Sequence, residues 1–179
     1  KLLILFLFFF IATNINATHI NGGYITYRYL GNDNYEITLV VYRDCYNGVP
    51  PFDDPASIGV FDNNNILIQN LLVPFTNNEL LFAPSDCMPN TICFEKSKYV
   101  DTVNIFPSSL PVTIAYQRCC RSILIQNIVD PSNTGMTFLA TINHIDNNSA
   151  VFGREIPGFT FVGDNFIYDG SAFDIDGDS

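Results

Sequence analysis

Short stretches of alternating apolar and polar residues recur along the chain, and Gly, Pro, Asn and Asp separate one stretch from the next. Within residues 35–43, Ile37, Leu39 and Val41 would share one face of an extended strand, because successive side chains of a strand point to opposite sides. These stretches are rich in Val, Ile, Thr, Tyr and Phe, which favour strands. No long segment has the period of an amphipathic helix. The pattern therefore predicts a protein built from short β-strands.

The clearest local prediction is a β-hairpin. Residues 24–30 and 35–43 form two strand-like stretches on either side of a turn-forming sequence at 31–34. Further strands are predicted at 57–62, 66–73, 99–106, 112–120, 136–143 and 159–162, and loops at 46–55, 77–91 and 130–135. About eight short strands with this spacing are typical of an antiparallel β-sandwich, so the expected fold class is all-β.

The beginning of the chain has the three parts of a signal peptide. Lys1 precedes the apolar run 2–12, polar Thr13 and Asn14 follow, and Ala17 supplies the small residue at the expected cleavage point. The alternative is a membrane anchor, but this run is too short for a bilayer core, which needs about 20 residues. We expect residues 1–17 to be a signal peptide and the protein to be extracellular or on the outer cell surface.

The charge of the chain limits its partners. The sequence has 18 acidic and 8 basic residues, a formal net charge of −10. No stretch is dense in Lys or Arg, so the basic surface that holds phosphate backbones is missing and nucleic acid is excluded as a partner. A solvated acidic surface is the simplest interpretation of this charge.

The cysteines predict disulfides, because an exported protein meets an oxidising environment. The five candidates are Cys45, Cys87, Cys93, Cys119 and Cys120. The last two are adjacent in the predicted strand 112–120, where neighbours face opposite sides, so we expect them to have different partners. The predicted pairs are Cys87–Cys93 and a bridge from Cys45 to either Cys119 or Cys120, with one cysteine left over. Zinc is the weaker alternative, since no CxxC motif is present and His19 is far in sequence from His144.

Catalysis has little support in the sequence, and we expect a protein that is not an enzyme. Motifs of the GxSxG, HExxH, P-loop and GxGxxG kinds are absent. A thiol dyad of Cys119 or Cys120 with His144 is one alternative, but an oxidised cysteine cannot act as the nucleophile. Asp53 and Asp54 are adjacent in a predicted loop and by themselves do not indicate glycoside hydrolysis.

The chain ends in a sequence with the spacing of metal ligands. Asp174, Asp176 and Asp178 alternate with other residues, and Gly177 allows a tight turn that would direct several carboxylates at one hard cation. We therefore expect calcium as the one candidate cofactor. The alternative is an acidic turn at a domain edge.

Two basic sequences and a group of tyrosines complete the candidate residues. Arg43-Asp44-Cys45 and residues 117–121 (QRCCR) could form an arginine cluster for a ligand, but Arg–Asp pairs that order loops beside a disulfide are the favoured interpretation. Six of the nine tyrosines fall between Tyr24 and Tyr46. They could form a sugar-stacking platform, although cross-strand aromatic pairing is the commoner arrangement.

An ordered set of motifs resembles the N-terminal region of large Bacteroidota surface proteins, the gliding-motility-associated or PKD-domain-containing adhesin-like proteins. The matching motifs are 18–31 (THINGGYITYRYLG), 35–39 (YEITL), 41–45 (VYRDC), 47–53 (NGVPPFD), 115–121 (AYQRCCR), 148–152 (NSAVF) and 174–179 (DIDGDS).

The resemblance implies export followed by type IX secretion, and an Ig-like or PKD-like sandwich at 18–165. Residues 166–179 would begin a following Ig-like or cadherin-like module. The implied function is a non-enzymatic adhesin-like module for surface binding or spacing, in a family that is associated with gliding motility. Its partners would be further domains of the same chain and an unidentified surface glycan or protein. The alternative is a carbohydrate-recognition or accessory module of an exported hydrolase.

Overall fold

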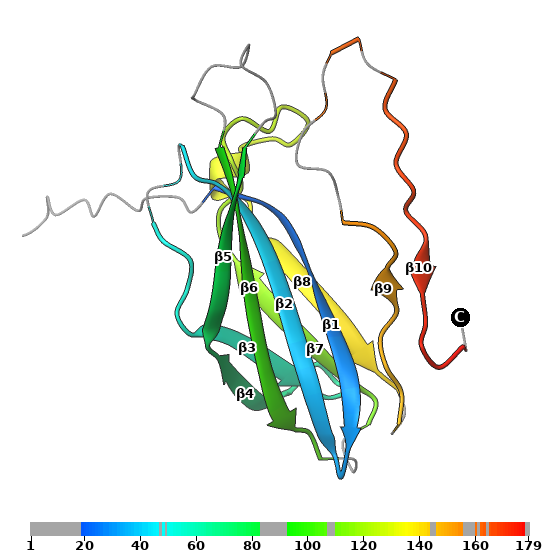
Figure 1. Cartoon of the computed structure of the whole chain (residues 1–179). Coiled ribbons are helices and arrows are strands. Elements are labelled where there is room, and N and C mark those ends of the chain that lie inside the picture. The colour runs from blue at the N-terminus through cyan, green and yellow to red at the C-terminus, as the bar shows by residue number, and fades with distance from the viewer. Residues whose placement is uncertain are drawn as a thin grey trace, which may run out of the picture.

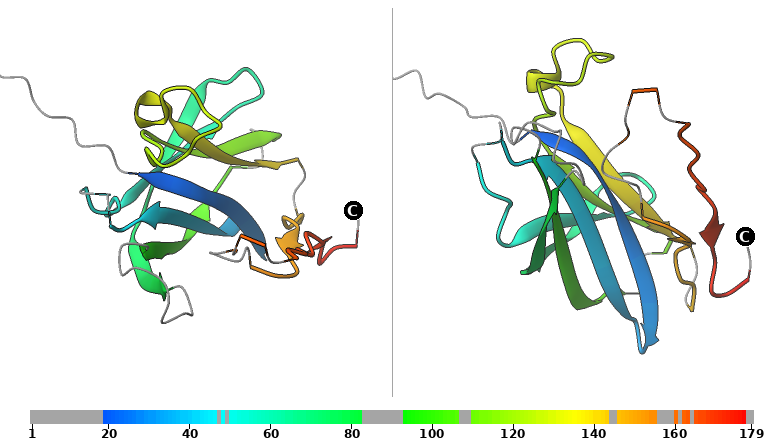
Figure 2. Two further views of the ribbon diagram at one scale, coloured as in Figure 1. Left: turned by 90° about the horizontal axis from the view of Figure 1, so that it is seen from above. Right: turned by 45° about the horizontal axis from the view of Figure 1, so that its top comes forward.

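A computed structural model of the chain describes residues 19–46, 48, 50–82, 93–106, 110–143, 146–155, 160, 162–163 and 165–177. The predicted signal peptide lies outside the described residues. Eight long strands form two antiparallel four-stranded sheets, and two short strands form a separate ribbon. The protein is an all-β sandwich, as the sequence predicts. Figure 1 shows the first sheet in front of the second, and the view from above in Figure 2 shows the two layers.

The first sheet has the order β1-β2-β6-β5 and the second has the order β4-β3-β7-β8. The strands of the first sheet are β1 (Ile20–Gly31), β2 (Asn34–Asp44), β5 (Phe75–Phe82) and β6 (Cys93–Asn104). The strands of the second are β3 (Ala56–Phe61), β4 (Leu67–Val73), β7 (Val112–Arg118) and β8 (Met136–Ile142). The ribbon consists of β9 (Val151–Phe152) and β10 (Ala172–Phe173), and a 3₁₀ turn, η3, spans Pro131–Asn133.

The β1–β2 hairpin confirms the clearest sequence prediction. Its connection is shorter than expected, because Asn32 and Asp33 alone form the turn and Asn34 already belongs to β2. Both turn residues have positive φ, 52° and 61°, which is the backbone of a two-residue hairpin turn. Asn and Asp tolerate this left-handed conformation better than most residues do.

The core lies between the sheets and follows the predicted alternation. Ile37, Leu39 and Val41 of β2 are buried, as are Ile58 and Val60 of β3 on the opposite sheet. Burial of such side chains is the main favourable term in folding, about 1.5–3 kcal/mol for each large one.

Gly23 shows how closely the two layers approach. A Cβ at this position would lie 2.9 Å from the Phe138 ring of the second sheet and 2.4 Å from the Val40 carbonyl oxygen. Only glycine leaves room for both neighbours without a shift of the backbone.

Two sequence predictions about strands are wrong. Residues 75–82 form edge strand β5, although most of them were expected in the loop 77–91. The strand predicted at 159–162 is missing at its described positions, since Thr160 and Val162 lie outside any strand. The division of the chain at residue 165 stays a prediction.

Candidate functional site

A groove on the outer face of the first sheet gathers polar, basic and aromatic side chains. We call it the outer groove, and its volume is about 220 Å³. Its floor comes from β1, β2 and β6, where Tyr24 pairs with Val40 and Val40 pairs with Lys98 across the ladder. The lining residues are Tyr24, Thr26, Thr38, Val40, Lys96, Lys98, Val151, Phe152, Arg154 and Glu155.

One wall of the outer groove is the segment 151–155, which a hydrogen-bonded anchor places beside β1. Ser149 donates its N–H to the Tyr27 carbonyl at 2.9 Å, and the Tyr27 N–H donates to the Ser149 hydroxyl at 2.9 Å. The Tyr29 N–H donates to Asn148 Oδ1 at 2.8 Å. From this anchor the chain continues to Phe152, whose ring meets the Tyr24 ring edge-on with centroids 5.8 Å apart.

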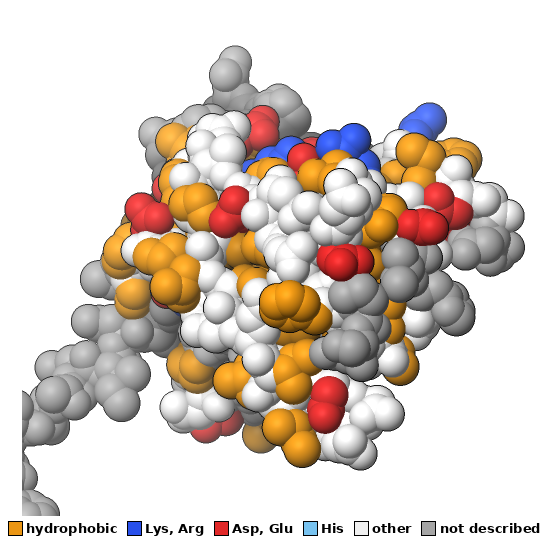
Figure 3. All heavy atoms as spheres, turned by 90° about the horizontal axis from the view of Figure 1, so that it is seen from below, with side chains coloured by type: hydrophobic (Ala, Val, Ile, Leu, Met, Phe, Trp, Pro, Cys, Tyr) orange, Lys and Arg blue, Asp and Glu red, His pale blue; other side chains and the backbone are white. Residues whose placement is uncertain are grey.

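Basic side chains outnumber acidic ones in the outer groove. Lys96 pairs with Glu155 and lies 4.0 Å from Glu79, so carboxylates balance its ammonium group. Lys98 and Arg154 make no ion pair with any residue in the described ranges. Three of the eight basic residues of an acidic protein therefore line one groove. In Figure 3, which views the sandwich from below, the visible Lys and Arg side chains lie along the edge that faces the viewer in Figure 1.

Tyr42 lies next to the outer groove, opposite Lys96 in the ladder. Its hydroxyl is buried and has no hydrogen-bond partner among the described residues. Burial raises the pKa of Tyr42, and the neighbouring Tyr24 and Glu155 raise it further. Burial also raises the pKa of Tyr24, with Glu155 adding to this effect and Lys96 opposing it. Both phenols are therefore neutral hydrogen-bond donors at ordinary pH.

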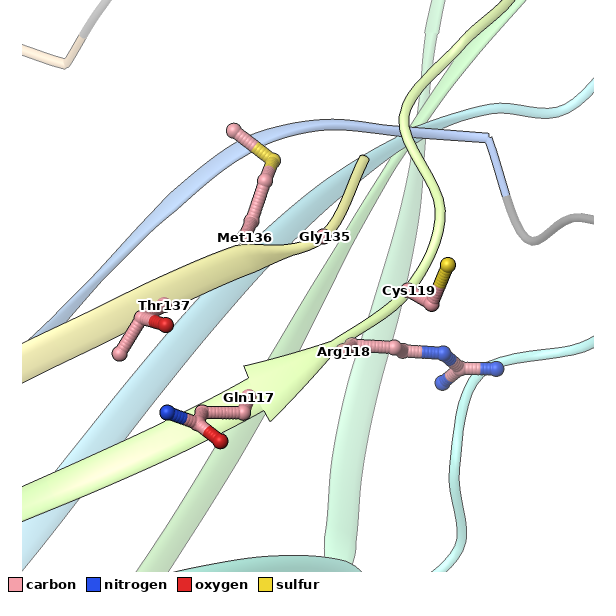
Figure 4. Close-up of a pocket in the computed structure, with 6 residues that line it drawn as sticks. All are labelled: Gln117, Arg118, Cys119, Gly135, Met136 and Thr137. Carbon is pink, nitrogen blue, oxygen red and sulfur yellow. The ribbon is translucent and has the colours of Figure 1, made fainter. Parts of the chain in front are cut away.

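A second, shallower pocket of about 290 Å³ lies where β7 and β8 end. Figure 4 shows Gln117 and Thr137 on the two neighbouring strands, while Arg118 extends away from β8. Arg118 is already paired, since its guanidinium lies 2.8 Å from Asp53 Oδ1 and donates to the Pro51 carbonyl at 2.8 Å. This pocket therefore offers fewer free polar groups than the outer groove does.

The disulfide pairs differ from those predicted. Cys45 is bonded to Cys93, and Cys119 is bonded to its neighbour Cys120. The prediction that the two adjacent cysteines have different partners is wrong because β7 ends at Arg118, so the alternation of faces does not extend to them. The predicted Cys87–Cys93 bridge is wrong because Cys45 occupies Cys93, and Cys87 lies outside the described residues.

Four of the five cysteine candidates are therefore in bridges, and the bridge between Cys119 and Cys120 removes the free thiol that the proposed dyad needs. His144, its supposed partner, lies outside the described residues. Asp53 and Asp54 bind neighbouring strands, since Asp53 pairs with Arg118 of β7 and Asp54 Oδ1 accepts the N–H of Phe75 in β5 at 3.3 Å.

The two arginine sequences order a loop beside a disulfide, which is the favoured interpretation of the sequence. Arg43 pairs with Glu95, donates to the Pro50 carbonyl, and places its guanidinium carbon 4.8 Å from the centre of the Phe52 ring. Arg118 holds the same loop through Pro51 and Asp53, as described above. Arg121 donates to the Gly135 carbonyl at 3.1 Å. Arg43 and Arg118 therefore hold the loop that joins β2 to β3, whereas Arg121 binds the segment that leads into β8.

Three of the six clustered tyrosines pack with one another on the core side of the first sheet. Tyr35 is buried between Tyr27 and Tyr29, with ring centroids 6.1 and 5.2 Å away. This arrangement is the cross-strand aromatic pairing that the sequence favoured. Tyr24 and Tyr42 belong to the outer face instead, so only these two remain available to a sugar platform in the first sheet.

The acidic C-terminal sequence forms the predicted turn. Gly177 has a φ of 76°, and its N–H donates to the Asp174 carbonyl at 3.3 Å. Asp174 Oδ1 accepts the Asp176 N–H at 2.9 Å, and both oxygens of Asp176 accept from Asn148, at 2.7 and 2.8 Å.

The carboxylates of this turn are the hard oxygen donors that calcium prefers. Asp178 lies outside the described residues, and no group of three or more metal-ligating His, Cys, Asp or Glu side chains occurs among those described. Calcium binding stays a prediction.

A buried polar cluster lies at the end of the sandwich near Cys120. Ser122 and Asp44 are almost fully buried, and the Ser122 hydroxyl donates to Asp44 at 3.5 Å. Asp44 also accepts the Tyr46 N–H at 2.9 Å, and its own N–H donates to the His19 carbonyl at 3.0 Å. These bonds tie the beginning of β1 to the end of β2, which is a structural role.

The outer groove was not predicted from the sequence, because the predicted strand began at Tyr99. In the structure β6 starts at Cys93, and this places Lys96 and Lys98 on one face. The spacing of two between these lysines was the available signal, but the contact with 151–155 is long-range and leaves no local pattern.

The fold and the site define an all-β, disulfide-bonded sandwich with a basic and aromatic groove on one sheet. No protein-family model matches the chain, and comparisons with curated proteins and with solved structures find no significant similarity. The described part of the chain contains no helix with the length and apolar character of a membrane span.

Proposed function

We propose that the chain is the non-enzymatic N-terminal module of a large secreted or cell-surface adhesin-like protein, and that it binds surface ligands through the outer groove. The observation that carries the proposal is the outer groove itself, where Lys98 and Arg154 have no ion-pair partner in the described residues and adjoin exposed Phe152. Binding sites are usually concave and mostly apolar, with a small number of polar groups that point to the same place.

Export is supported by the two disulfides, because such bonds persist in oxidising compartments. The motif resemblance adds type IX secretion, a gliding-associated family, and further Ig-like or PKD-like domains in the same chain to the proposal. A sandwich that served only as a structural spacer would not need a groove in which basic side chains outnumber acidic ones.

Antibody labelling of intact producing cells tests the proposed location. We expect labelling without permeabilisation, and tryptic peptides of a longer polypeptide in the labelled band. Labelling that appears only after permeabilisation would overturn the proposal.

The second candidate is a carbohydrate-recognition or accessory module of an exported hydrolase. The aromatic pair Tyr24 and Phe152 beside the hydroxyls of Thr26 and Thr38 favours it, because sugar rings present both an apolar face and hydroxyl groups.

A glycan array tests this candidate with two matched variants on the same sheet face. Thr38→Trp fills the outer groove, and Thr102→Trp places the same side chain two ladder positions away, opposite Glu36. We expect the first variant to lose glycan binding and the second to keep it. Equal binding by both variants would remove the outer groove as the site.

A further inference from the structure

We propose that the outer groove binds a carboxylated sugar unit of an acidic polysaccharide. The inference rests on the proposed binding function of the outer groove and names the class of ligand. The carboxylate would lie between Lys98 and Arg154, and the sugar ring would pack against Phe152 and Tyr24.

The charge of the groove selects an anion. The chain as a whole has a net charge of −10, so its general field repels acidic ligands. Lys96 is balanced by Glu155 and Glu79, whereas Lys98 and Arg154 have no such partner in the described ranges. An incoming carboxylate would supply the missing counter-charge through charge-assisted hydrogen bonds, which are roughly twice as strong as neutral ones.

The rest of the groove suits a hydroxylated ring. Phe152 is 50% exposed, and its edge-on contact with Tyr24 leaves an apolar surface at the wall. Thr26 and Thr38 place hydroxyl groups on the floor, opposite each other in the β1–β2 ladder. The volume of about 220 Å³ is below the 300–1,000 Å³ of typical drug-sized ligand pockets, so one small unit of a longer chain is the fitting occupant.

The position of the groove argues against an acidic peptide. Peptides that bind to sheets usually add a strand at a free edge, where unpaired backbone groups are available. The floor of the groove is the face of a sheet, and the backbones of β2 and β6 are paired on both sides. At the neighbouring edge of β1, Asn148 and Ser149 already bind the backbone of Tyr29 and Tyr27. Recognition at the groove therefore depends on side chains, which suits a sugar with many hydroxyl groups.

Calorimetry with defined oligosaccharides tests the inference on the full chain. The probes are an oligogalacturonate and the same oligosaccharide after its carboxylates have been reduced to alcohols. We expect the acidic form to bind about tenfold or more tightly than the neutral form, and its affinity to fall as salt is added. Tighter or equal binding of the neutral form would overturn the role of the carboxylate, while leaving the groove as a sugar site.

Three substitutions at exposed cations locate the contact. Lys98→Met and Arg154→Gln should each weaken oligogalacturonate binding about tenfold. Arg28→Gln is the matched control, because Arg28 lies on the same sheet face but pairs with Glu36 at 3.2 Å outside the groove. Unchanged binding in both groove variants, or an equal loss in the control, would overturn the site.

An acidic peptide and a neutral glycan complete the test. If poly-glutamate binds as tightly as the oligouronate and competes with it, the ligand class is wrong and the outer groove is a site for acidic protein segments. If neither acid binds but a neutral glycan does, the carboxylate inference fails and the proposed binding function survives. If none of the probes binds, both the inference and the carbohydrate-recognition function fail, whereas cell-surface labelling still decides the location of the protein.

Discussion

The phenol of Tyr116 donates a hydrogen bond to the Asp53 carboxylate at 2.6 Å, which connects the centre of the second sheet to the loop before β3. The other oxygen of Asp53 pairs with Arg118 at 2.8 Å, and the Asp53 carbonyl accepts the Tyr99 hydroxyl at 2.8 Å. Strands of both sheets therefore form hydrogen bonds with the same loop residue, Asp53.

Replacing Tyr116 by Phe should lower the free energy of unfolding by about 1.5 kcal/mol, because a partly buried hydrogen bond to a charged acceptor is lost. Tyr42→Phe is the matched control, since the Tyr42 hydroxyl is buried without a partner in the described chain, so its removal should leave the free energy of unfolding unchanged or raise it. Urea unfolding monitored by circular dichroism measures both. Equal losses would show that the Tyr116–Asp53 bond adds nothing.

The two disulfides should contribute unequally to stability. Cys45 and Cys93 are separated by 48 residues, and the chain-entropy model assigns a loop of that length about 4 kcal/mol. Cys119 and Cys120 are adjacent, so their bond removes little freedom from the unfolded chain.

We therefore expect Cys45→Ala with Cys93→Ala to destabilise the protein by about 4 kcal/mol, and Cys119→Ser with Cys120→Ser by clearly less. Trypsin provides a separate check of the pairing, because cleavage after Arg118 and Arg121 releases a tripeptide that is lighter by two hydrogen atoms when its cysteines are bonded. A tripeptide that reacts with iodoacetamide before reduction would contradict the adjacent bridge.

The stability of the protein should fall in alkaline solution. Burial raises the pKa of Tyr35 and the pKa of Tyr99 to about 12, against about 10 in an unfolded chain. Between these two pH values the unfolded chain loses protons that the folded chain keeps, so the free energy of unfolding decreases as pH rises. The stabilising effect is complete below pH 10 and lost above 12.

Absorbance of tyrosinate during a pH titration measures this behaviour. We expect buried Tyr35 and Tyr99 to ionise together with unfolding, at a pH above the usual tyrosine pKa of about 10. A single ionisation step near pH 10 for all tyrosines, with the fold intact, would contradict the prediction.

The stability of the β1 edge, and its protection from other chains, should depend on Asn148. Its side chain accepts from the Tyr29 N–H and donates to Asp176, so Asn148→Ala removes both bonds. We expect a loss of about 1–2 kcal/mol and greater self-association, because an uncovered strand edge pairs with other chains. Thermal unfolding and analytical ultracentrifugation measure the two effects, with exposed Asn63→Ala in a turn as control. A variant that stays monomeric and equally stable would show that the edge needs no cover.

Calcium binding should depend on the C-terminal turn. We expect calorimetry on the full-length protein to detect calcium, and Asp174→Asn to weaken its binding by removing a charged oxygen ligand. Asp169→Asn, at an exposed carboxylate outside the turn, is the control. Absence of a calcium signal in the unsubstituted protein would leave the turn with its observed hydrogen-bonding role alone.

The fold could be predicted where local sequence and long-range packing agree. The β1–β2 hairpin has a strict alternation and a turn of Asn32 and Asp33, so its residues define it without help from distant contacts. Strand β5 was missed because Asn77, Asn78 and Glu79 resemble a loop, and an edge strand tolerates polar residues that a central strand would not.

The candidate site was less accessible to prediction because it depends on segments far apart in sequence. Lys98 and Phe152 meet only because Ser149 and Asn148 bring their segment to β1. The predicted cysteine pairing was wrong for a local reason, because the prediction assumed that the strand continues through Cys120, whereas β7 ends at Arg118.

The bond between Asp176 and Asn148 determines how the molecule would respond to tension. A pull on the chain beyond Gly177 reaches Asp176 first, then Asn148, and only then the backbone of β1. The short β9–β10 ribbon lies on the same outer path and consists of only two residue pairs. These few bonds would break before the ladders of the sandwich do, so the C-terminal segment can extend and absorb load while the core and the groove floor stay folded.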